Sequence, residues 1–222
     1  MYLRRQDRWF DSFYRGRLTW IRPKYRDARS IEEFWQAEGD DWLNYKTRIG
    51  PWVDAAGREN AEIRSYDDLE GTAGVVGDLL GIIGADPGRL DLGQRVAVHN
   101  PSIPPAAAEL IRAVNSFPSS VILRKGKFIR AIRKMGLFNR STGSLVAPAL
   151  WKEIEAAYAD QNEELRAAWF SGPSRKFSYR EGPGPQPQAE QAVSFADGVL
   201  LVHAMLRSAD GAAAALAAHA RE

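Results

Sequence analysis

The chain has 222 residues, of which 45% are hydrophobic and 26% charged, as is usual for a globular domain with its own core. It has no cysteine, which excludes a disulfide scaffold, a thiolate zinc site and a cysteine nucleophile. Arginines interrupt the opening and no apolar run reaches bilayer length, so we expect a cytoplasmic protein.

The net charge of +2 is too small to indicate nucleic acid as the partner, but the charge is unevenly distributed. Residues 1–30 hold nine Lys or Arg against three Asp, and residues 101–140 hold eight basic residues against one acidic residue. Residues 31–100 hold six basic against fourteen acidic residues. Two basic blocks around an acidic one suit a fold that gathers positive charge at an anionic ligand.

The first eighteen residues predict a short strand that leads into a helix. An apolar tripeptide precedes Arg4 and Arg5, and aromatic residues then recur at three- and four-residue steps, as on one helix face. Ser12 follows Arg4 by eight residues, about two helical turns. An arginine where a strand enters a helix suits a phosphate, because the first helical amides and the guanidinium both favour an anion. The alternative is a solvated charge cluster and a surface serine.

This segment resembles a cofactor-binding element of the sulfotransferase superfamily, particularly of bacterial sulfotransferase-like proteins of polysaccharide biosynthesis. In that family a strand ends in an arginine, and a serine eight positions later lies in the following helix. The resemblance implies that Arg4 and Ser12 hold the 3′-phosphate of 3′-phosphoadenosine-5′-phosphosulfate, with Arg5 as the alternate to Arg4. It implies this nucleotide as the sulfuryl donor, no metal, and a hydroxyl-bearing acceptor such as a carbohydrate.

The likeness extends more loosely through residues 61–70, 100–115 and 150–170. It implies an α/β fold: an incomplete P-loop-type sulfotransferase domain over residues 1–171, rich in helix, with few short parallel strands. We expect the opening strand to pair in parallel with residues 61–65. The family places its phosphosulfate-binding loop and catalytic base before the position of Met1, so we expect a chain that begins inside the fold. Whether it is an enzyme by itself stays open.

Helix signals follow in chain order. Ser30 and Glu33 form a capping box that predicts a helix start. Asp40 or Asp41 is predicted to cap the next helix, which Gly57 ends. Four tryptophans in this region are read either as core or as an aromatic wall for a sugar: Trp20, Trp35, Trp42 and Trp52.

The glycine-rich stretch at residues 71–84 is not a phosphate loop, since its spacing differs from GxxxxGK[ST] and no lysine follows. We predict a helix here that Gly84 ends. Its buried face is expected to comprise Leu79, Leu80, Ile82 and Ile83.

A helix is predicted from Pro105 to about Asn115, and a basic amphipathic helix over residues 124–134. The basic helix is interpreted as a solvated helix with a core face, as part of an anionic ligand site, or as a contact with a membrane surface. Arg124, Lys125 and Gly126 match an arginine-lysine-glycine element that many sulfotransferases place against the 3′-phosphate.

Pro148 is predicted to begin the longest helix. Residues 172–190 are rich in proline and glycine and are interpreted as a flexible linker, followed by a helical hairpin over residues 191–222. Two other functional classes compete with the sulfotransferase: a non-catalytic helical interaction protein, and a binder of anionic membrane or nucleic acid through the basic helix.

Overall fold

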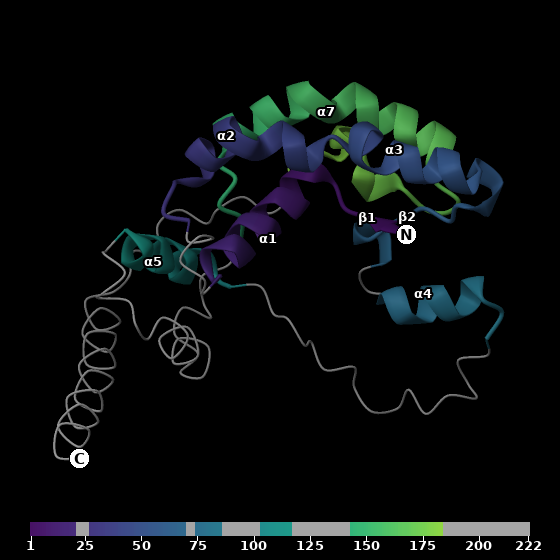
Figure 1. The fold of residues 1–222 in the computed structure, drawn as a ribbon, viewed down its shortest axis with the longest axis horizontal. Coiled ribbons are helices and arrows are strands. Elements are labelled where there is room, and N and C mark those ends of the chain that lie inside the picture. Colours follow the sequence, from purple (N-terminus) through teal and green to yellow (C-terminus); the bar gives the residue numbers. More distant parts are fainter. Residues whose placement is uncertain (21–26, 70–73, 86–102, 117–142, 184–222) are drawn as a thin grey trace, which may run out of the picture. The chain divides into compact units, whose positions relative to one another are not determined.

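The computed structural model describes residues 1–20, 27–69, 74–85, 103–116 and 143–183 (Figure 1). These residues are rich in helix and hold two short parallel strands, which confirms the coarse prediction. The main elements are β1 (Tyr2–Leu3), α1 (Gln6–Leu18), α2 (Ile31–Leu43), α3 (Tyr45–Ala56), β2 (Arg64–Ser65), α4 (Gly74–Ile82), α5 (Pro105–Asn115) and α7 (Pro148–Trp169).

The chain divides into two compact units whose boundaries fall inside α1 and α2. Unit 1 comprises residues 1–10, 35–101 and 146–184. Unit 2 comprises residues 11–34, 102–145 and 185–222.

The two strands of unit 1 pair in parallel, as the sequence predicted, with Leu3 opposite Ser65 (Figure 1). The amide of Tyr66 donates to the Leu3 carbonyl over 2.7 Å. A further parallel bridge joins Ile63 to Phe170, just beyond the end of α7. Three extended segments that are distant in sequence therefore run in the same direction side by side.

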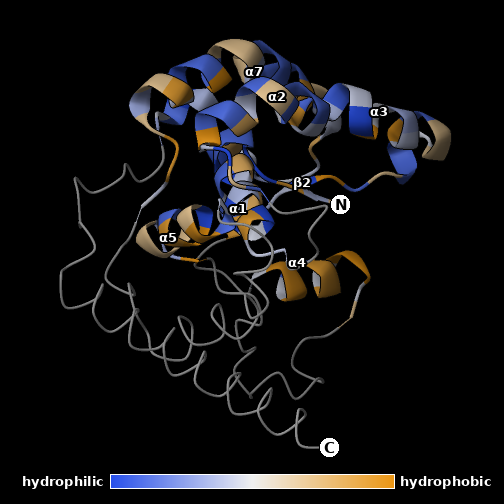
Figure 2. Ribbon diagram, turned by 60° about the vertical axis from the view of Figure 1, so that its left-hand side comes forward, coloured by the Kyte–Doolittle hydropathy of each residue, from blue (hydrophilic) through white to orange (hydrophobic). Residues whose placement is uncertain are grey.

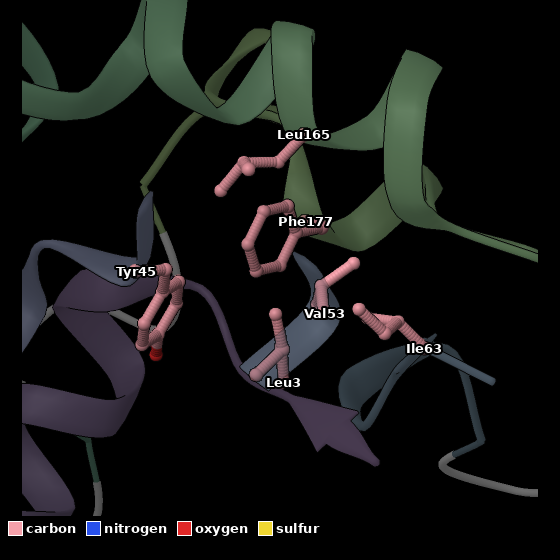
Figure 3. Packing of buried hydrophobic residues seen from close by; sticks show 6 residues of the cluster. All are labelled: Leu3, Tyr45, Val53, Ile63, Leu165 and Phe177. Carbon is pink, nitrogen blue, oxygen red and sulfur yellow. The ribbon is translucent and has the colours of Figure 1, made fainter. Parts of the chain in front are cut away.

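The hydrophobic core of unit 1 lies beside these extended segments. Six buried side chains point toward one another in Figure 3. They come from β1, the residue before β2, α3, α7 and the turn at residues 175–177: Leu3, Ile63, Tyr45, Val53, Leu165 and Phe177. Each is at most 5% exposed. Burial of this apolar surface is the main stabilising contribution to the unit.

A polar pair is buried next to this core. Gln6, in the first turn of α1, and Asn162, on α7, exchange amide hydrogen bonds of 2.7 and 2.8 Å. Asn162 also donates to the carbonyl of Phe177 over 3.0 Å. Because both amides are fully buried and mutually bonded, the pair fixes the start of α1 against α7 at little desolvation cost.

Residues 174–183 are not the flexible linker that the composition predicted. They form two short 3-10 turns, Arg175–Phe177 and Tyr179–Glu181, and both Phe177 and Tyr179 are buried. Besides these two buried rings, hydrogen bonds hold the segment: Arg5 donates to the carbonyls of Ser178 and Gly182, and Asn162 donates to the carbonyl of Phe177. The rest of the predicted linker and the predicted hairpin lie outside the described residues.

The capping signals were predicted partly correctly. Ser30 Oγ accepts from the amide of Glu33 and the Glu33 carboxylate accepts from the amide of Ser30, which confirms the capping box. The prediction that Asp40 or Asp41 caps the next helix is wrong, because α2 continues to Leu43. Asn44 caps α3 instead, and its side chain accepts from the amide of Thr47.

Helix α4 ends as predicted but is not buried as predicted. Gly84 has a φ of 68°, and the amide of Ala85 bonds back to the carbonyl of Leu80, so glycine ends the helix in the left-handed region. No residue of α4 is buried, however, and Leu79 and Ile83 are 47% and 65% exposed. Figure 2 shows the hydrophobic residues along this helix.

Unit 2 has its own core and its own buried polar contacts. The rings of Tyr14 and Phe34 are 5.7 Å apart and both are fully buried. The buried amide of Asn115, at the end of α5, donates to the carbonyls of Leu18 and Asp27. This amide joins the end of α1 to the segment that precedes α2.

A buried ion pair adds to unit 2. Asp11 and Arg15 are paired one turn apart on α1. Arg15 also donates to the carbonyl of Ile103 over 2.8 Å, and Asp11 accepts from the amide of Leu145 over 2.9 Å. Both charges are thereby satisfied by loop backbone.

Candidate anion site at the ends of the parallel strands

The candidate site lies where β1 and β2 end. Arg4 directly follows β1, and Asp67 begins the short 3-10 turn that follows β2. Because the two strands are parallel, their carboxyl ends lie at the same edge of the sheet. Ligands of parallel α/β sheets bind at this edge, next to the starts of the following helices.

Two arginines flank the carboxylate of Asp67. Arg4 Nε donates to Asp67 Oδ1 over 2.8 Å, and Arg8 Nη1 lies 3.5 Å from the same oxygen. Asp67 is fully buried, whereas the side chains of Arg4 and Arg8 are 27% and 22% exposed. The arrangement therefore presents two guanidinium groups to solvent around one buried negative charge.

An exposed aromatic ring lies beside Arg4. The guanidinium carbon of Arg4 lies 5.3 Å from the ring centre of Tyr66, which is 43% exposed. Contact of this kind favours the charged form of the guanidinium and limits its conformations. The surface next to Arg4 thus combines positive charge with a flat apolar face.

The backbone of Arg4 is held from the core side. The hydroxyl of Tyr45, the first residue of α3, donates to the Arg4 carbonyl over 2.7 Å. Burial raises the pKa of Tyr45, so the phenol stays neutral and remains a donor. This contact fixes the turn between β1 and α1.

Arg5 has a different environment from Arg4. It is fully buried, and Nε and Nη2 donate to the two carboxylate oxygens of Asp7 over 2.7 and 2.9 Å. Nη1 donates to the carbonyls of Ser178 and Gly182. Burial alone would lower the pKa of Arg5, but the hydrogen bonds and charge of Asp7 raise it. These contacts favour a structural role for Arg5 over the alternate phosphate-binding role.

The other predicted phosphate ligands are not brought to this site by any described contact. Ser12 lies on α1, is partly exposed, and belongs to unit 2. Arg124, Lys125 and Gly126 lie outside the described residues. Arg8 and Asp67 were not predicted as site residues, although Asp67 lies within residues 61–70, to which the resemblance extends.

Three buried polar atoms at this site have no hydrogen-bond partner among the described residues: Ser65 Oγ, Asp67 Oδ2 and Arg8 Nε. Ser65 ends β2, and the other two atoms belong to one ion pair. Buried polar groups are nearly always bonded to protein or to ordered water. The site therefore has hydrogen-bonding capacity that the described protein groups do not use.

The tryptophans of unit 1 have separate environments. Trp35 packs edge-on against Phe10 and Tyr158, which supports the core interpretation for this residue. Trp42 lies under the guanidinium of Arg48, with 4.5 Å from the guanidinium carbon to the ring centre. Trp52, by contrast, is 72% exposed on α3.

The described residues contain neither a membrane-spanning helix nor a cluster of metal-ligating side chains. Within residues 1–20, 27–69, 74–85, 103–116 and 143–183, no helix is long and apolar enough to cross a bilayer. No group of three or more His, Cys, Asp or Glu in those ranges could hold a metal ion. The candidate site is thus defined by arginine, carboxylate and hydroxyl groups.

Comparison with known protein families, with curated proteins and with solved structures finds no match for this chain.

Proposed function

We propose that the protein is a sulfotransferase-like nucleotide-binding protein that holds the 3′-phosphate of 3′-phosphoadenosine-5′-phosphosulfate at Arg4. The observation that carries the proposal is the position of Arg4 at the carboxyl end of β1, beside Arg8 and ahead of the first turn of α1. The proposal includes a P-loop-type arrangement of the parallel strands.

The chemistry of the site suits a phosphate monoester. Guanidinium groups bind phosphate oxygens through charge-assisted hydrogen bonds, and Arg4 and Arg8 place two guanidinium groups beside Asp67. The exposed ring of Tyr66 supplies a face for the sugar or the base of a nucleotide.

The proposed reaction moves the sulfuryl group in line from the donor to a hydroxyl, which we place on a carbohydrate. Positioning of the two substrates and cationic stabilisation of the transferred charge would supply most of the rate enhancement. The resemblance also implies a loop that wraps the 5′-phosphosulfate, and transfer requires such a loop. Ser12 and the basic residues 124–126 enter the proposal through the resemblance alone.

The proposal is tested by calorimetric titration with adenosine-3′,5′-bisphosphate. Arg4→Gln should weaken binding about ten- to a hundredfold, because it removes a charge-assisted contact while leaving an amide donor for Asp67. The matched control is Arg175→Gln, since Arg175 is a largely exposed arginine in an ion pair with Glu181, outside the candidate site. Absence of binding by the unaltered chain, or equal affinity in both variants, would remove the nucleotide proposal.

A non-catalytic interaction protein is the alternative, and one observation favours it. Helix α4 has a single charged residue, Asp78. Its carboxylate accepts hydrogen bonds from the Tyr2 hydroxyl over 2.9 Å and from the Arg64 guanidinium over 3.3 Å. The exposed large hydrophobic side chains of this segment are spaced along one helix face: Val76, Leu79 and Ile83. A helix with its charge turned inward and its apolar face outward suits packing against another apolar surface, and a second copy of this chain is the simplest partner.

Sedimentation velocity distinguishes this alternative. If α4 pairs two copies, the unaltered chain should sediment as a concentration-dependent dimer, and Leu79→Glu should shift it to monomer by placing a charge in the apolar contact. Trp52→Glu is the control, because Trp52 is an apolar residue on a different helix that is even more exposed than Leu79, 72% against 47%. A monomer at every concentration would exclude the self-association alternative.

A further inference from the structure

The unused hydrogen-bonding groups at the strand ends restrict what the site can bind. Asp67 Oδ1 is engaged by Arg4, whereas Asp67 Oδ2 is buried without a partner among the described residues. Arg8 approaches the same carboxylate through Nη1, and its Nε is also without a partner there. One acceptor and one donor of a single ion pair are therefore both unsatisfied.

The chemistry of these groups selects one kind of ligand atom. A free carboxylate oxygen repels an anion, so a phosphate oxygen does not satisfy Asp67 Oδ2. The adjacent guanidinium groups of Arg4 and Arg8 repel an ammonium group. A neutral amide N–H could donate to Asp67 but could not accept from Arg8. A hydroxyl can do both, because it has one donor and two acceptor lone pairs, so a ligand hydroxyl can replace a water molecule at this position.

We propose, on the basis of the proposed nucleotide function, that Asp67 and Arg8 bind a hydroxyl that neighbours the phosphate held by Arg4. In a nucleoside 3′-phosphate this group is the ribose 2′-hydroxyl. It donates to Asp67 Oδ2 and accepts from Arg8 Nε, two buried atoms of an ion pair whose arginine side chain is partly exposed. Asp67 and Arg8 are then specificity-determining residues that select a ribonucleotide over a deoxyribonucleotide.

Ser65 extends this site toward the strand. Its side chain is 1% exposed, its Oγ has no partner in the described part of the chain, and it stands two residues before Asp67. A serine hydroxyl can donate to or accept from a bound hydroxyl. Ser65 therefore provides a second, uncharged position at which the inference can be tested.

The test compares calorimetric affinities for adenosine-3′,5′-bisphosphate and for its 2′-deoxy analogue. The unaltered chain should bind the ribonucleotide about ten- to a hundredfold more tightly, the effect of one hydrogen bond to a charged group. Asp67→Asn should reduce this ratio several-fold, whereas Arg175→Gln should leave it unchanged. Circular dichroism of each variant verifies that it is folded.

Each outcome bears on a different claim. Equal affinities for the two nucleotides, with binding retained, would overturn the hydroxyl site and leave the phosphate site standing. A ribonucleotide preference that persists in folded Asp67→Asn would also overturn it. If Asp67→Asn does not fold, the same two affinities are measured for Ser65→Ala and Arg8→Gln. The ribonucleotide preference is expected to decrease in at least one of these variants, and an unchanged preference in both would overturn the hydroxyl site. Failure of both nucleotides to bind the unaltered chain would remove the proposed function and this inference together.

Discussion

Phe177→Ala is expected to lower the free energy of unfolding by about 3–5 kcal/mol, the range for removing a phenyl group from a packed core. The ring is fully buried and lies 4.7 Å from the ring of Phe170 and 6.1 Å from that of Tyr45, centre to centre. Its removal leaves a cavity between α3 and the segment after α7, where Figure 3 shows the ring at the centre of the cluster. Urea denaturation followed by tryptophan fluorescence and circular dichroism measures the change.

The control is Trp52→Ala, which removes a larger aromatic ring from an exposed position on α3. Exposed substitutions usually change stability by less than about 0.5 kcal/mol. If Phe177→Ala were as mild as Trp52→Ala, residues 174–183 would not belong to the core. The predicted linker would then begin at residue 172 after all.

The segment around Phe177 is a part of the fold that amino-acid composition could not predict. Its glycine, proline and charged residues predicted a linker, and the signal that was overlooked is the pair Phe177 and Tyr179 within that polar stretch. Burial depends on the surface that long-range contacts provide, and one-dimensional composition does not contain those contacts. Helix α4 shows the converse, since its apolar sequence predicted a buried face that the described residues do not cover.

Local signals were more reliable than composition. The capping box at Ser30 and Glu33, the proline start of α5 and the glycine end of α4 were predictable because each depends on residues within one or two turns. The parallel pairing of β1 with β2 is long-range, and it was predicted from the resemblance and not from periodicity.

In the candidate site too, the local feature could be predicted from the sequence and the long-range contact could not. The position of Arg4 at a strand-to-helix junction follows from the local pattern. Its contact with Asp67 joins residues 63 positions apart, and nothing in the local sequence marks that aspartate as the partner. The sequence also could not separate Arg4 from Arg5, because two adjacent arginines in a turn differ only in the direction that the fold gives each side chain.

The difference between these adjacent arginines leads to the second large effect. We expect Arg5→Met to lower the free energy of unfolding by about 3–5 kcal/mol, because it leaves the buried carboxylate of Asp7 without its partner. It also leaves the carbonyls of Ser178 and Gly182 without their donor, so the C-terminal turns lose their attachment to the start of α1. Thermal and urea unfolding measure the loss.

A double variant separates the ion pair from the carbonyl contacts. Arg5→Met combined with Asp7→Leu removes both charges, so it should be more stable than Arg5→Met alone, because an uncompensated buried charge costs more than a lost pair. Recovery should be incomplete, since the carbonyls of Ser178 and Gly182 still lack the guanidinium donor.

An Arg5→Met variant as stable as the unaltered chain would show that this guanidinium is not buried, and would return Arg5 to consideration as the phosphate ligand. A double variant no better than the single one would place the whole loss on the two carbonyls. The fixed direction of Arg5 into the protein is what leaves Arg4, one residue earlier, as the arginine at the strand end that can meet a ligand.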